Sequence, residues 1–526
     1  MRSGRDWART ISWLGLVLGP VLGVAAYMLL PHAARDESGA VVAGLSHAAR
    51  AAAGVGVLMA IWWLSEAIPL PATSLVPLVA FPLLGVMPIG AAAAPYAGDI
   101  VFLFLGGFIL GLSMERWGLH KRIALLTVLI VGTGPKRVIG GFMLATACIS
   151  LWVNNTSTTI MMLPIALSVI SLVAVRHAPP GTPSDQATSP DPNFDSTLLL
   201  GVAYASSIGG VGTLIGTAPN AIMAAFVEDA LGRPMGFAQW LTFALPVVVV
   251  FLLIAWVYMT CISQPVRLKT IPGGRALIRG ELRALGPMSR GEWTVLVVFG
   301  ATVLLWVLRP WLQALGRRHG LIIPSGLNDT TIAIASALAL FIIPVDAKQR
   351  RAAMDWDTAV RLPWGALLLF GGGLSLAAAI TATGLDRFIG AGFAALGTLP
   401  LWLAILVVTA VVVFLTELCS NTALTTVMLP ILAAAAPAMG VDPMRVVVPA
   451  TLAASMAFMM PVGTPPNAIV FGTGKITMGQ MARTGLGLNV LSIAVITIFS
   501  VVLGDRLARP APDASGAQAD AQQVDR

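Results

Sequence analysis

Long apolar stretches separated by short polar segments run along almost the whole chain. Most of them approach the roughly 20 residues that a helix needs to cross the apolar core of a bilayer. The pattern predicts an all-α polytopic membrane protein with about eleven transmembrane helices. The charge-poor stretches lie near residues 11–30, 51–68, 71–87, 138–175, 198–226, 239–262, 293–311, 329–345, 399–436, 445–471 and 486–504.

The first stretch, residues 11–30, follows three arginines and resembles a secretion signal in this respect. It is long, however, and no small-x-small cleavage site follows it, so we expect an uncleaved first helix. Because Arg2, Arg5 and Arg9 precede the helix, we expect the N-terminus in the cytoplasm and the protein in the inner membrane.

Composition excludes a soluble globule, because 57% of the 526 residues are hydrophobic and only 11% are charged. Much of the net charge of +8 lies in one polar segment, residues 263–292. The position of this segment between apolar stretches suits a cytoplasmic loop that faces anionic membrane lipid. No aromatic platform accompanies the charge, so we expect no nucleic-acid binding. The cations of the segment are Arg267, Lys269, Arg275, Arg279, Arg283 and Arg290.

The three cysteines and five histidines are scattered along the chain. Their spacing predicts no transition-metal cluster, no disulfide framework and no nucleophilic triad. An enzyme is therefore the weakest class of function for this sequence, and we expect none.

One set of motifs occurs twice in the same order. Gly106 and Gly118 recur 266 residues later as Gly372 and Gly384, because 372 − 106 and 384 − 118 give the same offset. Such a duplication is typical of secondary transporters, whose substrate site lies where the two halves meet. The other repeated pairs are Asn155-Thr156 with Asn421-Thr422, Leu163-Pro164-Ile165 with Leu429-Pro430-Ile431, and Gly216-Thr217 with Gly463-Thr464 at an offset of 247.

The segments around Gly106 and Gly372 are broken by glycine and are followed closely by charged pairs. We expect both to form re-entrant hairpins, near residues 99–131 and 364–389, that border a central site. Five crossings per half after one extra helix would make the repeat inverted. The expected parts are 1–48 with the first helix, 49–262 as the first repeat, 263–292 as the basic loop, 293–504 as the second repeat and 507–526 as a disordered tail.

In each half an apolar helix is interrupted by small polar residues, within 137–175 and within 399–436. Asn, Ser and Thr compete for backbone hydrogen bonds, so a break is expected at both places. A broken helix exposes N–H groups that attract an anion and carbonyl groups that attract a cation. These residues could instead bind helices to one another, but that explanation suits one motif better than four in symmetric pairs.

Two acidic residues, Glu66 and Glu417, lie in or beside apolar stretches. An ionisable group at membrane depth is a functional candidate, here for proton coupling. A structural alternative, in which the carboxylate braces the broken helix, stays equally open.

Residues 50–504 resemble the divalent-anion/sodium symporter family, which includes sodium-dicarboxylate and sodium-sulfate cotransporters. The paired Ser-Asn-Thr signatures of the family appear as Asn154-Asn155-Thr156 and Ser420-Asn421-Thr422. The resemblance implies substrate contacts from Asn155, Thr156, Thr217, Asn421, Thr422 and Thr464. It implies two sodium sites, one with Ser150, Asn154, Asn155 and Gly216, the other with Thr416, Cys419, Asn421 and Gly463.

Asn154 stands where the family signature has Ser, and its longer side chain could change ion affinity. Cys419 is expected to offer its backbone carbonyl, because sulfur is a poor ligand for a hard cation. The resemblance also implies a homodimer in which a transport domain moves like an elevator against a scaffold domain.

The expected function is sodium-coupled symport of a small dianion, foremost a C4-dicarboxylate such as succinate, malate or fumarate, with Na⁺ as the coupling ion. Within the carrier class the alternatives are sodium-independent dicarboxylate exchange and a sodium-coupled sulfate or tricarboxylate carrier. A channel is the alternative from another class, since its pore can use the same carbonyls and helix ends.

Overall fold

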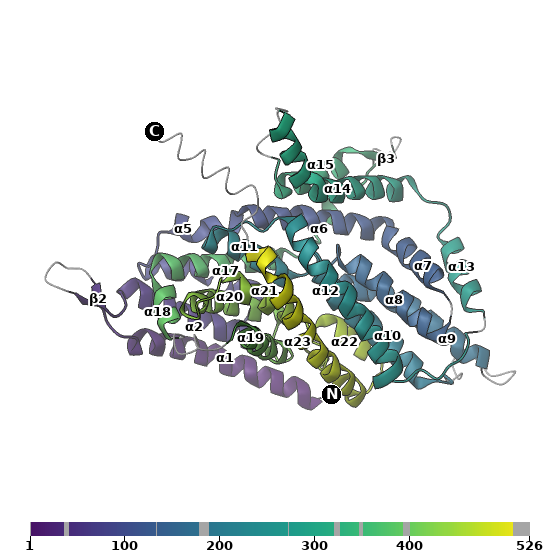
Figure 1. Ribbon diagram of the computed structural model, residues 1–526, viewed down its shortest axis with the longest axis horizontal. Helices are drawn as coiled ribbons and strands as arrows, with labels where there is room; N and C mark the ends of the chain where they lie inside the picture. Colours follow the sequence, from purple (N-terminus) through teal and green to yellow (C-terminus); the bar gives the residue numbers. More distant parts are fainter. Residues whose placement is uncertain are drawn as a thin grey trace.

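The computed structural model describes residues 2–35, 41–132, 134–177, 189–271, 273–319, 327–346, 351–392 and 400–508 (Figure 1). The described part consists of helices and two short antiparallel hairpins. One hairpin pairs β1 (Ala34–Arg35) with β2 (Val41–Ala43), and the other pairs β3 (Pro344–Asp346) with β4 (Arg351–Ala352). Apart from its first two residues, the predicted tail 507–526 lies outside the described residues.

The helices up to the basic segment begin with α1, which precedes the first repeat. They are α1 (Arg2–Leu29), α2 (His47–Ser65), α3 (Leu70–Thr73), α4 (Val76–Leu83), α5 (Ile89–Ala93), η1 (Ala94–Ala97), α6 (Asp99–Trp117), α7 (Leu119–Val131), α8 (Pro135–Ser150), α9 (Asn155–His177), α10 (Pro192–Gly210), α11 (Ala218–Leu231), α12 (Phe237–Val257) and the π-helical turn η2 (Tyr258–Ser263).

The predicted basic loop 263–292 contains a helix, α13 (Gly274–Ala284). The helices that follow it are α14 (Arg290–His319), α15 (Asp329–Ile342), α16 (Trp356–Ala359), α17 (Trp364–Ala382), α18 (Leu385–Gly392), α19 (Leu401–Thr416), α20 (Asn421–Ala438), α21 (Met444–Ala454), α22 (Pro465–Phe471) and α23 (Met478–Ala508).

Nine helical segments in the described part of the chain are long and apolar enough to cross a membrane. Shorter apolar helices accompany them at 70–83, 329–342, 401–416 and 444–454. The prediction of an all-α, multi-pass membrane protein is therefore confirmed at this level. The nine segments are Thr10–Leu29, His47–Ser65, Ile89–Trp117, Asn155–His177, Phe237–Ser263, Arg290–Gly316, Trp364–Ala382, Asn421–Ala438 and Met478–Gly504.

Large apolar side chains are exposed along the outer helices α1, α12, α14 and α23. Leu29 on α1 is 84% exposed and Val502 on α23 is 68% exposed. Contact of such a surface with water is energetically unfavourable, whereas the acyl chains of lipid solvate it. The interior, by contrast, buries its largest side chains completely, including Trp63, Trp240 and Trp306.

Both predicted hairpin regions form two helices joined by a short turn that contains one left-handed glycine. Gly118 joins α6 to α7 with φ +72°, and Gly384 joins α17 to α18 with φ +73°. A side chain is strained in this backbone conformation, so glycine serves both turns. The two turns occupy equivalent positions of the repeat, since 384 − 118 is 266.

The two halves of the chain interlock through their short motif helices. In the first half α11 packs against α17, α20 and α21 of the second half. In the second half α22 packs against α9 and α10 of the first half, beside which Figure 1 shows it. Each half thus supplies a helix to the other, and the four repeated polar motifs lie at this junction.

Candidate functional site

The first helix break lies between α8 and α9. The helix ends at Ser150, residues 151–154 are not helical, and α9 starts at Asn155. The Ser150 hydroxyl oxygen lies 2.8 Å from Asn155 Oδ1 and 2.7 Å from the carbonyl oxygen of Ser206 on α10. A hydroxyl has one hydrogen, so these three oxygens share a single donor and present an excess of lone pairs.

The second break repeats this arrangement between α19 and α20. The Thr416 hydroxyl oxygen lies 2.7 Å from Asn421 Oδ1 and 2.7 Å from the carbonyl oxygen of Ala454 on α21. Thr416 and Asn421 follow Ser150 and Asn155 by 266 residues. The repeated sequence therefore folds into the same local hydrogen-bond pattern twice.

The repeated Gly-Thr pairs are each followed by x-Pro-Asn, and these motifs, residues 216–220 and 463–467, form matching turns before α11 and α22. Thr217 and Thr464 precede the helices with φ/ψ of −144°/148° and −144°/149°. The Asn220 side chain donates to the carbonyls of Val211 (3.0 Å) and Thr213 (2.7 Å). Asn220 is not among the predicted site residues, and the structure shows that it holds the turn in place.

Asn467 is the counterpart of Asn220 in the second half. Its side chain donates in the same way to the carbonyls of Ala457 (3.0 Å) and Met460 (3.0 Å). Both asparagines are fully buried. Because a buried amide that lost these partners would be costly, each asparagine fixes the carbonyls of its turn in one direction.

Gly216 brings its turn against the first break. A Cβ atom at Gly216 would collide with the Gly210 carbonyl oxygen and lie 2.9 Å from the Ser150 carbonyl oxygen. A Cβ atom at Gly210 would collide with Asn155 Oδ1. Oxygens of Ser150, Asn155 and Gly210 therefore converge around Gly216, and only glycine permits this approach.

The second turn differs in one respect, because a buried carboxylate replaces an apolar side chain. Glu417 is 3% exposed, and its first-half equivalent is Leu151, since 417 − 266 is 151. One Glu417 oxygen accepts from the backbone N–H groups of Phe458 (2.6 Å) and Met459 (2.8 Å). The other accepts from Met460 N–H at 3.0 Å.

A fourth donor reaches Glu417 from the last long helix. The Asn489 side-chain amide on α23 lies 2.8 Å from Glu417 Oε1. Glu417 forms no ion pair within the described part of the chain. Four N–H groups thus donate to one buried carboxyl group, which braces the turn that carries Gly463, whose Cβ would lie 3.1 Å from Glu417 Oε2.

The remaining predicted site residues occupy distinct positions. Asn154 is exposed, and its side-chain oxygen accepts from Ser157 N–H at 2.8 Å, which caps α9. The Cys419 thiol donates to the Leu415 carbonyl (3.0 Å), which leaves the Cys419 carbonyl as its oxygen donor. Thr156 and Thr422 are half-buried in the first turns of α9 and α20.

Glu66 lies at the end of α2, within electrostatic range of Cys419 at the second break. It ends α2 in a left-handed conformation (φ +48°), and its side chain is exposed. Its carbonyl accepts from the Ser12 hydroxyl at 3.1 Å, which ties α2 to α1. The structure therefore gives Glu66 a place at the end of α2, next to α1.

The donor set of the two breaks fits a hard monovalent cation. Hydroxyl, amide and carbonyl oxygens converge there, and such ligands suit sodium better than a transition metal. No cluster of three His, Cys, Asp or Glu side chains that could hold a metal occurs among the described residues.

Paired helix breaks with oxygen clusters at the junction of two repeats are typical of secondary transporters. A family model described as the sodium:sulfate symporter transmembrane region matches residues 39–508. The chain belongs to this sodium:sulfate symporter family, as the resemblance of its motifs predicted.

Several curated proteins are similar over nearly the whole chain. The sodium-dependent dicarboxylate transporter SdcS of Staphylococcus saprophyticus is 41% identical over 507 residues, which covers 95% of this chain and 93% of that relative. The protein of the same name from Staphylococcus aureus strain MRSA252 is 38% identical over 506 residues, with the same coverage.

Two solved structures share the fold at low sequence identity. The Alcanivorax borkumensis YdaH transporter has a TM-score of 0.55 and 13% identity, covering 96% of this chain and 99% of its own. Neisseria gonorrhoeae MtrF, from a class of antimetabolite efflux pumps, has a TM-score of 0.56 and 14% identity, covering 94% and 97%. At these identities the likeness concerns the fold alone.

Proposed function

We propose that the protein is a secondary active transporter that couples sodium entry to the uptake of a C4-dicarboxylate. The duplicated oxygen cluster carries this proposal, because Ser150 with Asn155 and Thr416 with Asn421 offer two equivalent places for a cation. The relatives that cover most of the chain are named sodium-dependent dicarboxylate transporters.

In the proposed mechanism, sodium binds first at the two breaks. One site uses Ser150, Asn154, Asn155 and Gly216, and the other uses Thr416, Cys419, Asn421 and Gly463. Cations there would hold the starts of α9 and α20 in place, so that their free N–H groups face an anion. Binding of the cation and of the anion then become mutually favourable.

The dicarboxylate would lie between the two halves. Its carboxylates would accept hydrogen bonds from Asn155, Thr156 and Thr217 on one side and from Asn421, Thr422 and Thr464 on the other. Neutral donors suit a site that must also release its substrate, since no fixed positive charge holds the dianion.

We further propose that the helix pairs α6–α7 and α17–α18 are re-entrant hairpins of an inverted repeat, and that they move with the site in an elevator motion of a homodimer. Their matching glycine turns support this assignment. Cysteine accessibility at Thr383, measured from both sides of oriented vesicles, would test the hairpin. Labelling from one side at all times would contradict a moving tip.

The decisive experiment is uptake of labelled succinate into proteoliposomes that contain the purified protein. An inward sodium gradient is compared with potassium or choline, and excess malate, fumarate or sulfate serves as competitor. Saturable, sodium-driven accumulation that malate inhibits would support the proposal.

Sodium-independent uptake that needs internal dicarboxylate would replace symport with exchange. Sulfate, which the description of the matching family names, is the second candidate substrate. If sulfate inhibits uptake and malate does not, the protein would be assigned as a sulfate transporter. Flux that fails to saturate with substrate would point to a channel.

A further inference from the structure

Helix α13, inside the predicted basic loop, carries a stripe of arginines on its exposed side. Arg275, Arg279 and Arg283 follow one another at intervals of four residues, so they lie along one face, and all three are exposed. Ile278 anchors the same helix to the protein, because its side chain is 2% exposed and belongs to the core. α13 packs against α7 and α9 and lies at the edge of the molecule (Figure 1).

The surroundings of the stripe are also cationic. Four further exposed cations flank it, and the only exposed carboxylate on α13 is Glu281. None of the seven cations forms an ion pair with a described residue. Arg176 lies beside the start of α13, because a Cβ at Gly273 would be 3.8 Å from its guanidinium. The four flanking cations are Arg176, Arg267, Lys269 and Arg290.

The position of α13 along the chain places this charge at the membrane surface. The candidate span Phe237–Ser263 ends before α13, and the span Arg290–Gly316 begins six residues after it. Trp293, 54% exposed near the start of α14, is the kind of side chain that concentrates at the interface between membrane and water. Lipid phosphates lie at that level.

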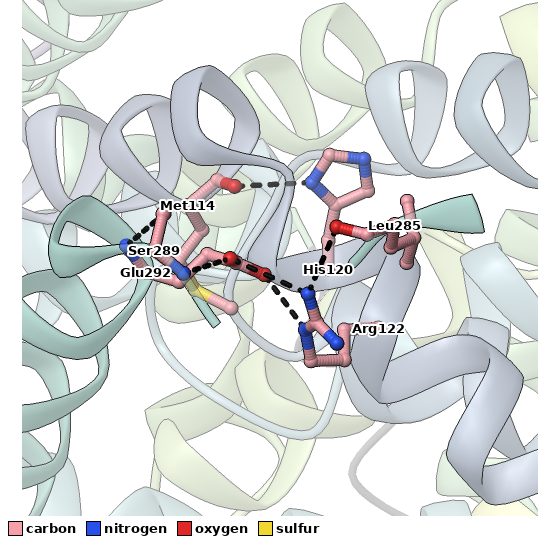
Figure 2. A network of polar contacts seen from close by, with 6 residues as sticks. All are labelled: Met114, His120, Arg122, Leu285, Ser289 and Glu292. Atoms are coloured by element: carbon pink, nitrogen blue, oxygen red, sulfur yellow. Dashed lines mark hydrogen bonds and ion pairs between the residues drawn. The ribbon is translucent and has the colours of Figure 1, made fainter. Parts of the chain in front are cut away.

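A network of polar contacts fastens the end of α13 to α7 and α14 (Figure 2). Arg122 on α7 donates to the Leu285 carbonyl (3.5 Å) and forms an ion pair with Glu292 at 2.8 Å. Both side chains are nearly buried, at 11% and 7% exposed. A ligand that immobilises α13 would therefore also restrict the start of α7, through Arg122.

Glu292 has a second role in the same network. Its carboxylate accepts from Ser289 N–H at 2.7 Å, and the Ser289 hydroxyl accepts from Glu292 N–H at 3.1 Å. This reciprocal pair is a capping box that starts α14. The start of α14 and the end of α13 thus share one buried ion pair with α7.

We infer that the Arg275–Arg279–Arg283 face of α13 is a binding site for the headgroups of anionic phospholipids. The site positions α13 on the membrane surface and, through Arg122, the helix pair α6–α7. The inference stands independently of the proposed substrate, because it concerns a surface remote in sequence from both helix breaks.

The test measures binding of fluorescent phosphatidylglycerol, with phosphatidylcholine as the comparison, to the full-length protein in a neutral detergent. The triple variant Arg275→Gln/Arg279→Gln/Arg283→Gln removes the stripe. The control triple variant Arg318→Gln/Arg361→Gln/Arg387→Gln removes three exposed arginines elsewhere. All six side chains are exposed, and unchanged thermal melting without lipid verifies that each variant folds.

The stripe variant is expected to bind phosphatidylglycerol roughly 100-fold more weakly, since each basic side chain near an anionic surface contributes about fivefold. The control variant should bind as the wild type does. Equal affinity of the stripe variant and the wild type, or equal losses in both variants, would overturn the inference. Displacement of the lipid by excess inorganic phosphate alone would also overturn it, because the site would then recognise free phosphate.

Discussion

The two asparagines after the helix breaks are the residues on which the proposed site depends most. Asn155 and Asn421 each lie next to a hydroxyl and begin a helix. Replacing either with Ala removes an oxygen from one cluster and a donor from the dicarboxylate site. We expect Asn155→Ala and Asn421→Ala to lower sodium-driven uptake to background while size-exclusion profiles stay unchanged. Wild-type uptake by either variant would remove that residue from the site.

Substitution of Gly216 tests the geometry of the first oxygen cluster directly. In Gly216→Ala the added methyl group would displace the carbonyls of Gly210 and Ser150, so we expect uptake to fail. Gly300→Ala on α14 is the matched control, because no atom lies within 4 Å of the added carbon. We expect the control to transport normally, and similar uptake by both variants would contradict the crowded geometry.

Substitution of Glu417 distinguishes a structural role, in which its side chain braces the turn, from a role as a proton carrier. In Glu417→Gln an amide N–H₂ would face N–H groups that now bind a carboxylate, so at least one buried group loses its partner at a cost of about 1–3 kcal/mol. We expect a lower melting temperature together with lost uptake. A proton carrier would instead keep its stability and lose the pH dependence of uptake. Glu66→Gln, at an exposed helix end, should change neither quantity.

At the scale of helices, Arg122 and Glu292 join three elements that are distant in sequence. Removing one member of a buried ion pair leaves an uncompensated charge and costs about 3–5 kcal/mol. We expect Arg122→Gln and Glu292→Gln each to lower stability, and the double variant to lose less than the sum of the two. Denaturant unfolding of all four proteins measures this coupling. Additive losses would show that Arg122 and Glu292 do not stabilise the protein as a pair.

The helices themselves were largely predictable from sequence, for a physical reason. Apolar length sets the spans, and small polar residues disrupt helical hydrogen bonding locally, so the breaks at 151–154 and 417–420 follow from nearby residues. α13 was expected as part of a loop, because its stripe of arginines obscured a short helix with only a few apolar positions. Its buried face depends on α7, which lies far away in sequence.

At the scale of the whole molecule, the repeat marked the positions of both helix breaks but not the contacts that hold them. Asn155, Gly216, Asn421 and Gly463 were identified because they recur. The partners of Glu417 were not, since Phe458 and Asn489 lie 41 and 72 residues away and have no repeated signature. Long-range hydrogen bonds of this kind depend on the tertiary fold, which one sequence does not display.

The two similar oxygen clusters, which we propose bind sodium, predict cooperative use of this ion. If both must fill before the dicarboxylate binds, uptake should rise sigmoidally with sodium concentration, with a Hill coefficient above one. Initial rates of succinate uptake at varied sodium, with ionic strength held constant by choline, measure this. Thr416→Ala, which weakens one cluster so that the other fills first, should lower the coefficient toward one and raise the sodium concentration that gives half-maximal uptake. A hyperbolic curve for the wild-type protein would contradict two coupled sites.

The exchange of α11 and α22 between the halves has an evolutionary consequence. A half-length ancestor with this fold would have left one side of its own broken helix uncovered, because the helix that packs there comes from the other copy. Such an ancestor would have been stable only as a pair of identical chains. A gene fusion that joined such a pair would leave each copy free to diverge, and the equivalent positions 151 and 417 now differ, with leucine at one and glutamate at the other.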